Sequence, residues 1–333
     1  MKVMTVSLFV LILIVIIVVL TLGYTFKISK QTPSLSKINT FVDSRLSLRK
    51  KKPKRLMFVD FWSNFNPYKP NVFTNLLSKY EYKYTIVSSQ PDILIYSVFG
   101  NEHQKYGKCK RVFYSGEHKQ ATDKSLRMNP QCHLSLTFYP TFGKNIRFPY
   151  FFWVYLREKY PYDMSMSNIK KKKRFCSFVY SNNRATFRNK FCLQLSKYKK
   201  VACGGKSLNN IGYLVKDKIN FQRNFKFGIS FENSTTPDYV TEKILETYAS
   251  NTVPIYFGSV NIKDDFNPQT FINGHDFRNY YELINYIKRV DNDDALYQSF
   301  FNKPILSLKW RKILSDPNQF YLKDIVRKIY ADK

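Results

Sequence analysis

Acidic residues are scarce in this chain. Its 333 residues include 24 Asp and Glu against 54 Lys and Arg, which gives a formal net charge of +30. Such an excess of positive charge attracts nucleic acid, phosphorylated ligands or an anionic membrane surface. The motifs of nucleic-acid binding are missing too: there is no RNP-like aromatic segment, no zinc-finger spacing and no helix with a compact Arg/Lys face. Nucleic acid is therefore not expected as a partner.

Cysteine is also scarce, and its spacing excludes the common cysteine-based metal sites. The five cysteines occur at 109, 132, 176, 192 and 203, with no C-x-x-C among them. Cys132 is followed by His133, but one such pair does not make a metal site. The odd number leaves at least one cysteine without a partner in the chain. Cys176 and Cys192 fall in apolar surroundings, where a small buried residue is expected.

Apolar residues are plentiful: 44% of the chain is hydrophobic and 17% aromatic, enough for a packed core. Residues 3–22 are almost all Val, Ile and Leu without charge, the length that spans a bilayer. A cleaved signal peptide is the alternative, but the apolar run is too long and no small-x-small site follows. We expect an uncleaved anchor. The basic residues that follow it would place the body in the cytoplasm by the positive-inside rule.

The remaining chain divides by composition into a linker and two α/β halves. Residues 1–24 are predicted as the transmembrane anchor, 25–54 as a basic stem, 55–165 as one domain and 166–333 as a second. Strands are expected at 56–61, 84–87, 92–99, 111–114, 175–180, 201–202, 226–231 and 253–257, and helices at 72–80, 185–196, 281–289 and 295–301. The segment 119–170 gives no clear pattern. Alternating strands and helices predict the α/β class.

One stretch, residues 231–259, contains most of the candidate functional residues. It reads FENSTTPDYVTEKILETYASNTVPIYFGS and lies between two apolar strands. Thr236, Pro237 and Asp238 resemble a helix start, with a hydroxyl cap, a proline and an acid in the first turn. In open α/β sheets such a strand–helix–strand unit binds anions near the helix N-terminus.

The helix in this stretch has two distinct faces. At about 100° per residue, an apolar group faces the sheet and a polar group faces away. The apolar group is Val240, Ile244, Leu245 and Tyr248, and the polar group is Tyr239, Glu242, Lys243 and Glu246. An amphipathic helix with a solvated face explains this pattern as well as a ligand site does.

The sequence motif in this stretch favours the ligand site. FENSTTPDYVTEK followed by VPIYFG resembles the signature of the α-1,3/α-1,4-fucosyltransferase family, and is closest to its bacterial-type members. The resemblance implies a GT-B-like fold, with two Rossmann-like domains facing a cleft, and inverting transfer of L-fucose from GDP-fucose to a glycan. It also implies a type II membrane protein with a lumenal body in a Golgi- or ER-like compartment, against the flanking charges.

The resemblance extends to individual residues. Arg111–Glu117 (RVFYSGE) is similar to a second family segment, whose Glu is the proposed general base; here it is Glu117. The donor-site residues that it implies are Arg188, Tyr213, Asn233, Tyr239, Glu242 and Lys243. Lys243 and Arg188 would stabilise the diphosphate, and Glu242 would accept hydrogen bonds from the ribose. No metal is required, although an accessory Mn²⁺ or Mg²⁺ that helps the diphosphate leave stays open.

Position alone gives Glu117 two readings. It follows a glycine just past an apolar strand, where loops carry function, but a surface turn glutamate fits the same place.

Asp291-Asn292-Asp293 matches the Asp-x-Asp of the metal-dependent GT-A class, yet it sits between two expected helices, where a connecting turn is simpler.

Three functions remain open. The first is fucosyl transfer to a glycan hydroxyl, through an α-1,3 linkage to N-acetylglucosamine or glucose. The second is transfer from another nucleotide sugar by the same architecture. The third is a non-catalytic basic protein that binds nucleic acid or an anionic surface.

Overall fold

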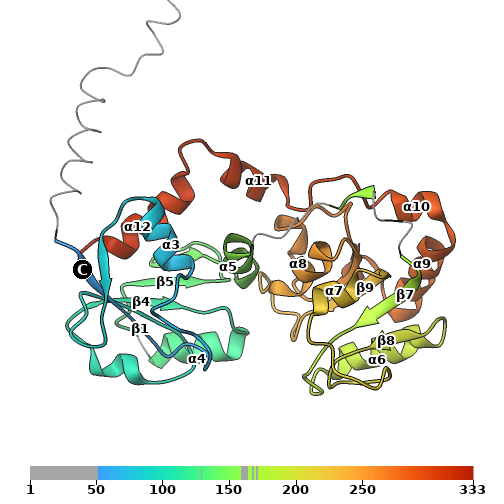
Figure 1. Cartoon of the computed structure of the whole chain (residues 1–333), viewed down its shortest axis with the longest axis horizontal. Coiled ribbons are helices and arrows are strands. Elements are labelled where there is room, and N and C mark those ends of the chain that lie inside the picture. Colours follow the sequence, from blue (N-terminus) through green and yellow to red (C-terminus); the bar gives the residue numbers. More distant parts are fainter. Residues whose placement is uncertain (1–51, 129, 159–163, 167–168, 170–171, 333) are drawn as a thin grey trace, which may run out of the picture. The chain divides into compact units, whose positions relative to one another are not determined.

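The computed structural model describes residues 52–128, 130–158, 164–166, 169 and 172–332 (Figure 1). From Lys54 onward the chain forms one compact unit. The predicted anchor at 3–22 and nearly all of the predicted stem lie outside the described residues. Among the described helices none is long and apolar enough to cross a membrane.

The first half is a parallel sheet with the strand order β2-β1-β3-β4-β5-β6. Its strands are β1 (Lys54–Val59), β2 (Tyr84–Ile86), β3 (Ile93–Tyr96), β4 (Lys110–Tyr114), β5 (Leu134–Thr137) and β6 (Asn145–Arg147). The two central strands, β3 and β4, are buried at every residue. Because parallel sheets are covered on both faces, such strands read as continuous apolar runs, which is why they could be predicted.

Helices cover both faces of this sheet. They are α3 (Val72–Lys79), α4 (Lys119–Met128) and α5 (Tyr150–Arg157), with a short 3₁₀ turn η1 (Glu102–Lys105). α3 begins with a capping box, in which the Asn71 side chain accepts from the amides of Phe73 and Thr74. Leu126 of α4 packs on one face beside Phe113, whereas α3 and α5 pack on the other beside Tyr114.

The second half is another parallel sheet, with the order β11-β10-β9-β7-β8. Its strands are β7 (Arg174–Phe178), β8 (Val201–Cys203), β9 (Phe225–Phe231), β10 (Val253–Phe257) and β11 (Ile272–Asn273). The predicted α/β class, with two parallel sheets, is therefore confirmed. Gly205 follows β8, and a Cβ there would lie 2.0 Å from the Tyr180 carbonyl oxygen, so the close backbone approach at this point depends on glycine.

Nine helical segments complete the second half of the described chain. They are α6 (Thr186–Ser196), α7 (Lys218–Gln222), α8 (Glu242–Ala249), η3 (Ile262–Asp264), η4 (Gly274–Asp276), α9 (Tyr280–Asn292), α10 (Asp294–Gln298), α11 (Leu308–Ser315) and α12 (Phe320–Tyr330). The last of them, α12, returns to the first half and lies beside α3 (Figure 1). There the Tyr330 hydroxyl donates to the Lys83 carbonyl oxygen at 2.7 Å. The predicted division at residue 165 stays a prediction.

The cysteines and the Asp-x-Asp match have structural roles. All five cysteines are free and buried, so the expectation for Cys176 and Cys192 is confirmed. Asp293 caps α10 by accepting from the Leu296 amide at 2.9 Å, as a connecting turn would. Asp291 is buried and paired with Lys199 and Lys226. Within the described ranges, no group of three His, Cys, Asp or Glu side chains could hold a metal ion.

Candidate functional site

A pocket of about 470 Å³ contains most of the predicted site residues. From the first half it is lined by Trp62, Asn64, Ser97, Phe99, Gly116, Glu117, Tyr150 and Arg157, and from the second half by Asn233, Tyr239, Thr241, Glu242 and Lys243. Loops that follow β1, β3, β4 and β9 therefore meet here. The carboxyl ends of parallel strands are the expected place for a ligand site in α/β sheets.

Glu117 lies on the turn between β4 and α4, and hydroxyl groups fix its backbone. Its amide donates to Ser115 Oγ at 3.2 Å, and its carbonyl oxygen accepts from Thr122 Oγ1 at 2.9 Å. Ser115 Oγ and Thr122 Oγ1 are themselves 2.7 Å apart. A side chain at residue 116 would displace Tyr150, because a Cβ there would lie 2.7 Å from the Tyr150 ring. The carboxylate of Glu117, by contrast, accepts no hydrogen bond within the described chain.

The opposite side of the pocket is organised by Glu232, a residue that the sequence did not single out. Glu232 directly follows β9 and is fully buried. One carboxylate oxygen accepts from the Thr241 amide at 2.7 Å, and the other accepts from the Thr241 hydroxyl at 2.7 Å and from Lys243 Nζ at 3.1 Å. A buried carboxylate is tolerated only when it is paired and hydrogen-bonded in this way.

The Lys243 ammonium is held by three oxygens. Besides Glu232, it donates to Thr241 Oγ1 at 2.6 Å and to Glu242 Oε1 at 3.4 Å. Burial lowers the pKa of Lys243, but the negative charges of Glu232 and Glu242 outweigh burial, and the pKa lies well above its ordinary value. Lys243 is therefore a fixed positive charge at the pocket.

The predicted helix start was wrong by five residues. α8 begins at Glu242, with Thr241 as the capping residue, rather than at Thr236–Asp238. Asp238 has φ +64°, a left-handed conformation that no α-helix accepts. The solvated-face interpretation was wrong as well, because Tyr239 and Lys243 are buried. The predicted apolar face of Val240, Ile244, Leu245 and Tyr248 is confirmed as buried.

Two tyrosine hydroxyls at the pocket stay protonated at neutral pH. Burial raises the pKa of Tyr239, and the charge of Glu232 raises it further. Burial, reinforced by the charge of Glu242, raises the pKa of Tyr150 to about 12. Both hydroxyls can donate a hydrogen bond to a ligand oxygen.

Arg188 lies behind the pocket lining rather than in it. The side chain is fully buried, with the guanidinium 3.8 Å from the centroid of the Tyr180 ring. Nη1 donates to Asn233 Oδ1 at 3.1 Å, and Nη2 donates to the Asn182 carbonyl oxygen at 2.9 Å. Burial raises the pKa of Tyr180, and the charges of both Arg188 and Lys243 oppose that rise, so the two cations lie near the same ring.

Tyr213, like Arg188, is a predicted site residue that does not line this pocket. Its side chain is 58% exposed and does not line the pocket. The loop around it is nevertheless ordered by Asn209, whose side-chain amide donates to the Tyr213 carbonyl oxygen at 2.9 Å. A ligand that reached Tyr213 would have to extend beyond the pocket.

Several pocket residues had no sequence signal. Trp62 and Phe99 come from loops after β1 and β3, and Tyr150 and Arg157 from α5, within the segment that gave no clear pattern. The Arg157 side chain is 43% exposed and forms an ion pair with the neighbouring Glu158. Their seven-residue spacing on a helix puts Tyr150 and Arg157 on one face, which could have been recognised only if α5 itself had been predicted.

Comparison with known proteins covers both halves of the described chain. Residues 56–155 match the alpha-(1,3)-fucosyltransferase FucT N-terminal domain, and residues 169–320 match the glycosyltransferase family 10 (fucosyltransferase) C-terminal domain. The chain is 31% identical to alpha-(1,3)-fucosyltransferase FucT of Helicobacter pylori, over 80% of this chain and 65% of that relative. It is 34% identical to human 4-galactosyl-N-acetylglucosaminide 3-alpha-L-fucosyltransferase 9, over 43% of this chain and 38% of that relative.

Solved structures agree with the sequence matches. The chain is similar to a crystal structure of alpha1,3-fucosyltransferase with GDP, with a TM-score of 0.67, 27% identity, and coverage of 86% of this chain and 92% of that one. The crystal structure of alpha1,3-fucosyltransferase with GDP-fucose gives a TM-score of 0.65 and 26% identity, with coverage of 85% and 93%. The chain spans less than two thirds of the length of the curated relatives above. Both domains of one family are present in order, and the chain belongs to glycosyltransferase family 10, the fucosyltransferases.

Proposed function

We propose that this protein transfers L-fucose from GDP-fucose to a hydroxyl group of a glycan, with inversion at the anomeric carbon. The observation that carries the proposal is the pocket, where Glu117 of the first half faces Asn233, Tyr239, Glu242 and Lys243 of the second. The similarity to structures solved with GDP and with GDP-fucose supports the choice of donor.

The chemistry requires a base and a positive environment for the leaving group. The acceptor oxygen attacks the anomeric carbon while the Glu117 carboxylate takes the hydroxyl proton. The bond between that carbon and the phosphate oxygen breaks, and GDP departs with the electron pair. Because the Glu117 backbone is fixed while its carboxylate accepts no hydrogen bond within the described chain, it is suited to receive a proton.

The second half supplies the positive environment. All three N–H groups of Lys243 already have acceptors, and the bond to Glu242 is the longest, at 3.4 Å. We propose that Glu242 turns to the ribose hydroxyls when donor binds, which frees one N–H for the diphosphate. Arg188 would act through Asn233 in the arrangement described, and would touch phosphate itself only after a change of side-chain conformation. Tyr213 would contact a part of the donor outside the pocket.

Three further features belong to the proposal. The reaction needs no resident metal, since the residues above supply the charge; an accessory Mn²⁺ or Mg²⁺ would have to arrive with the diphosphate. Residues 3–22 would anchor the enzyme in a membrane, with a lumenal body in a Golgi- or ER-like compartment. The acceptor would be N-acetylglucosamine or glucose in a glycan, fucosylated through an α-1,3 linkage.

A ligand screen on the full-length chain tests the donor. We expect GDP to raise the unfolding temperature and UDP and a short DNA duplex to leave it unchanged, because binding to the native state alone stabilises it. Stabilisation by UDP would favour another nucleotide sugar, and stabilisation by duplex alone would favour a basic binding protein without catalysis. Release of GDP from GDP-fucose in the presence of N-acetyllactosamine then tests turnover.

A further inference from the structure

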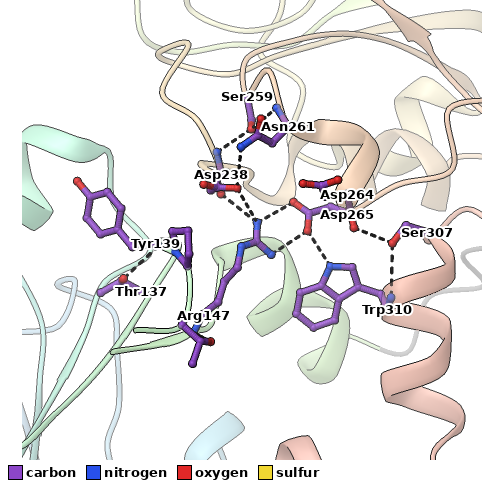
Figure 2. A network of polar contacts seen from close by, with 12 residues as sticks. Thr137, Tyr139, Arg147, Asp238, Ser259, Asn261, Asp264, Asp265, Ser307 and Trp310 are labelled. Atoms are coloured by element: carbon purple, nitrogen blue, oxygen red, sulfur yellow. Dashed lines mark hydrogen bonds and ion pairs between the residues drawn. The ribbon is translucent and has the colours of Figure 1, made fainter. Parts of the chain in front are cut away.

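One buried ion pair joins the two halves beside the pocket. Arg147, the last residue of β6, binds Asp265 of the second half through two hydrogen bonds, Nη1 to Oδ1 at 2.8 Å and Nη2 to Oδ2 at 2.9 Å. Both side chains are at least nine-tenths buried. Trp310 Nε1 donates to the same Oδ1 at 2.7 Å, and Figure 2 shows the three side chains converging.

The same guanidinium also reaches the turn that precedes α8. Nη2 donates to the Asp238 carbonyl oxygen at 3.3 Å (Figure 2). Asp238 is fixed from other directions as well, since its amide donates to Ser259 Oγ at 2.8 Å and its Oδ1 accepts from Asn261 at 3.2 Å. A non-glycine residue with positive φ costs about 1–3 kcal/mol and persists only where its surroundings impose it. The conformation of Asp238 is thus imposed from outside its own segment.

This turn leads directly into the pocket. The next residue, Tyr239, lines the pocket, followed by Thr241, Glu242 and Lys243. A second link between the halves lies close by, where the Phe151 amide donates to the Val240 carbonyl oxygen at 3.2 Å. The residue before Phe151 is Tyr150, whose ring lies against Gly116. The segment from Arg147 to Phe151 therefore contacts both the turn that carries Glu117 and the turn that carries Tyr239.

We propose that Arg147 is a positioning residue, which sets the donor-side turn against the sheet that carries Glu117 through its contacts with Asp265 and Asp238. The inference rests on the proposed function but assigns Arg147 no contact with either substrate. A positioning role accounts for a charged pair at this place, where an apolar pair of similar volume would stabilise the fold as well. An apolar side chain could not bind the Asp238 carbonyl oxygen.

The test compares Arg147→Lys with a matched control. Lysine keeps the charge but cannot bind both Asp265 oxygens and the Asp238 carbonyl oxygen from one planar group. The control is Lys226→Met, which breaks the ion pair of Lys226 with the buried Asp291, two residues that do not line the pocket. Asp265→Asn, of the same shape, serves as a second variant where Arg147→Lys folds poorly.

Two readouts separate positioning from mere stability. In folded Arg147→Lys we expect amide exchange of residues 238–241 to rise by about tenfold or more, because these amides depend on the imposed turn. We expect kcat per GDP-binding site to fall by about 10- to 100-fold, as a displacement of about 1 Å would cause. Lys226→Met should lower the unfolding temperature alone.

Unchanged exchange and unchanged kcat per GDP-binding site in both Arg147→Lys and Asp265→Asn would overturn the inference, even if both variants were less stable. Failure of the wild-type chain to bind GDP would instead overturn the proposed function, and this inference with it. The two failures are distinguished by the wild-type measurement alone.

Discussion

The two turns that meet at the pocket are held in place by different chemistry. On the first half, neutral hydroxyls of Ser115 and Thr122 fix the backbone of Glu117. On the second half, buried charges do this work: Glu232 binds Thr241 and Lys243, and Arg147 binds Asp238. The hydroxyl partners fix the Glu117 backbone without adding a charge. Paired charges keep a positive site fixed, which suits an anionic leaving group.

The largest expected effect on activity comes from changing Glu117, on the turn that neutral hydroxyls hold in place. Glu117→Gln should lower kcat for fucose transfer by about 10²–10⁴-fold, since an amide cannot take the acceptor proton. GDP affinity should stay within about twofold of the wild type, because the donor residues are on the other half. Transfer assays and calorimetric titration with GDP measure the two quantities. Activity close to wild type would remove Glu117 from the mechanism.

On the charged side, the first change is Lys243→Met. It leaves the Glu232 carboxylate buried without its cation, which should destabilise the fold by about 3–5 kcal/mol. GDP affinity should also fall by about tenfold or more, the loss of a hydrogen bond to a charged group. Urea unfolding and GDP titration are the measurements.

Its companion variant, Glu232→Gln with Lys243→Met, removes both charges at once. We expect it to regain most of the stability, because no unpaired charge is left in the interior. GDP affinity should remain low. Recovery of affinity together with stability would show that Lys243 serves the fold rather than the donor.

These differences mark the limit of what the sequence could predict. Ile244, Leu245 and Tyr248 follow the helical period of α8, so their burial was predictable from neighbours in sequence. The true start of α8 was not, because Asp238 is held by Ser259, Asn261 and Arg147, which are 21, 23 and 91 positions away. A cap motif is local, whereas the conformation that overrode it is imposed by tertiary contacts.

The candidate site shows the same division. Glu117, Asn233, Tyr239, Glu242 and Lys243 stand in recognisable motifs and do line one pocket. Glu232 stands in the same motif, but nothing in the sequence states that its carboxylate is buried against Lys243. Arg188 was predicted as a phosphate contact, but it lies fully buried in α6, where Phe191 stacks on Phe231 of β9. Motifs thus identify residue types, while burial decides which of them can touch a ligand.

The stability of the second half, where buried charges hold the turn, should also depend on pH through Lys172. Its amine is buried and donates to the Ser250 carbonyl oxygen and Thr252 Oγ1, just past the end of α8. Burial, with a smaller effect of Arg223, lowers the pKa of Lys172 to about 7. Below pH 7 the folded and unfolded states both hold the proton; between about pH 7 and 10 only the unfolded state does.

Stability should therefore rise with pH across that window, by at most about 1.4 kcal/mol per pH unit from this group. Urea unfolding at pH 6.5, 8 and 9.5 measures the trend in the wild type and in Lys172→Met. The difference between the pH dependence of stability in the wild type and in Lys172→Met isolates the contribution of Lys172 from those of the other titrating groups. Equal slopes in the two proteins would mean that Lys172 stays charged in the fold.

The smallest effect is expected from Thr122→Val, which removes one hydroxyl from the neutral side. Valine has nearly the same shape, but it cannot donate to the Glu117 carbonyl oxygen or pair with Ser115 Oγ. Losing such a hydrogen bond costs about 0.5–1.5 kcal/mol, so kcat should fall by about tenfold or less. GDP affinity should not change, and Thr122→Ser, which restores the hydroxyl, should restore kcat. A fall in GDP affinity instead would show that the two turns are coupled, and that the neutral side does not act on the base alone.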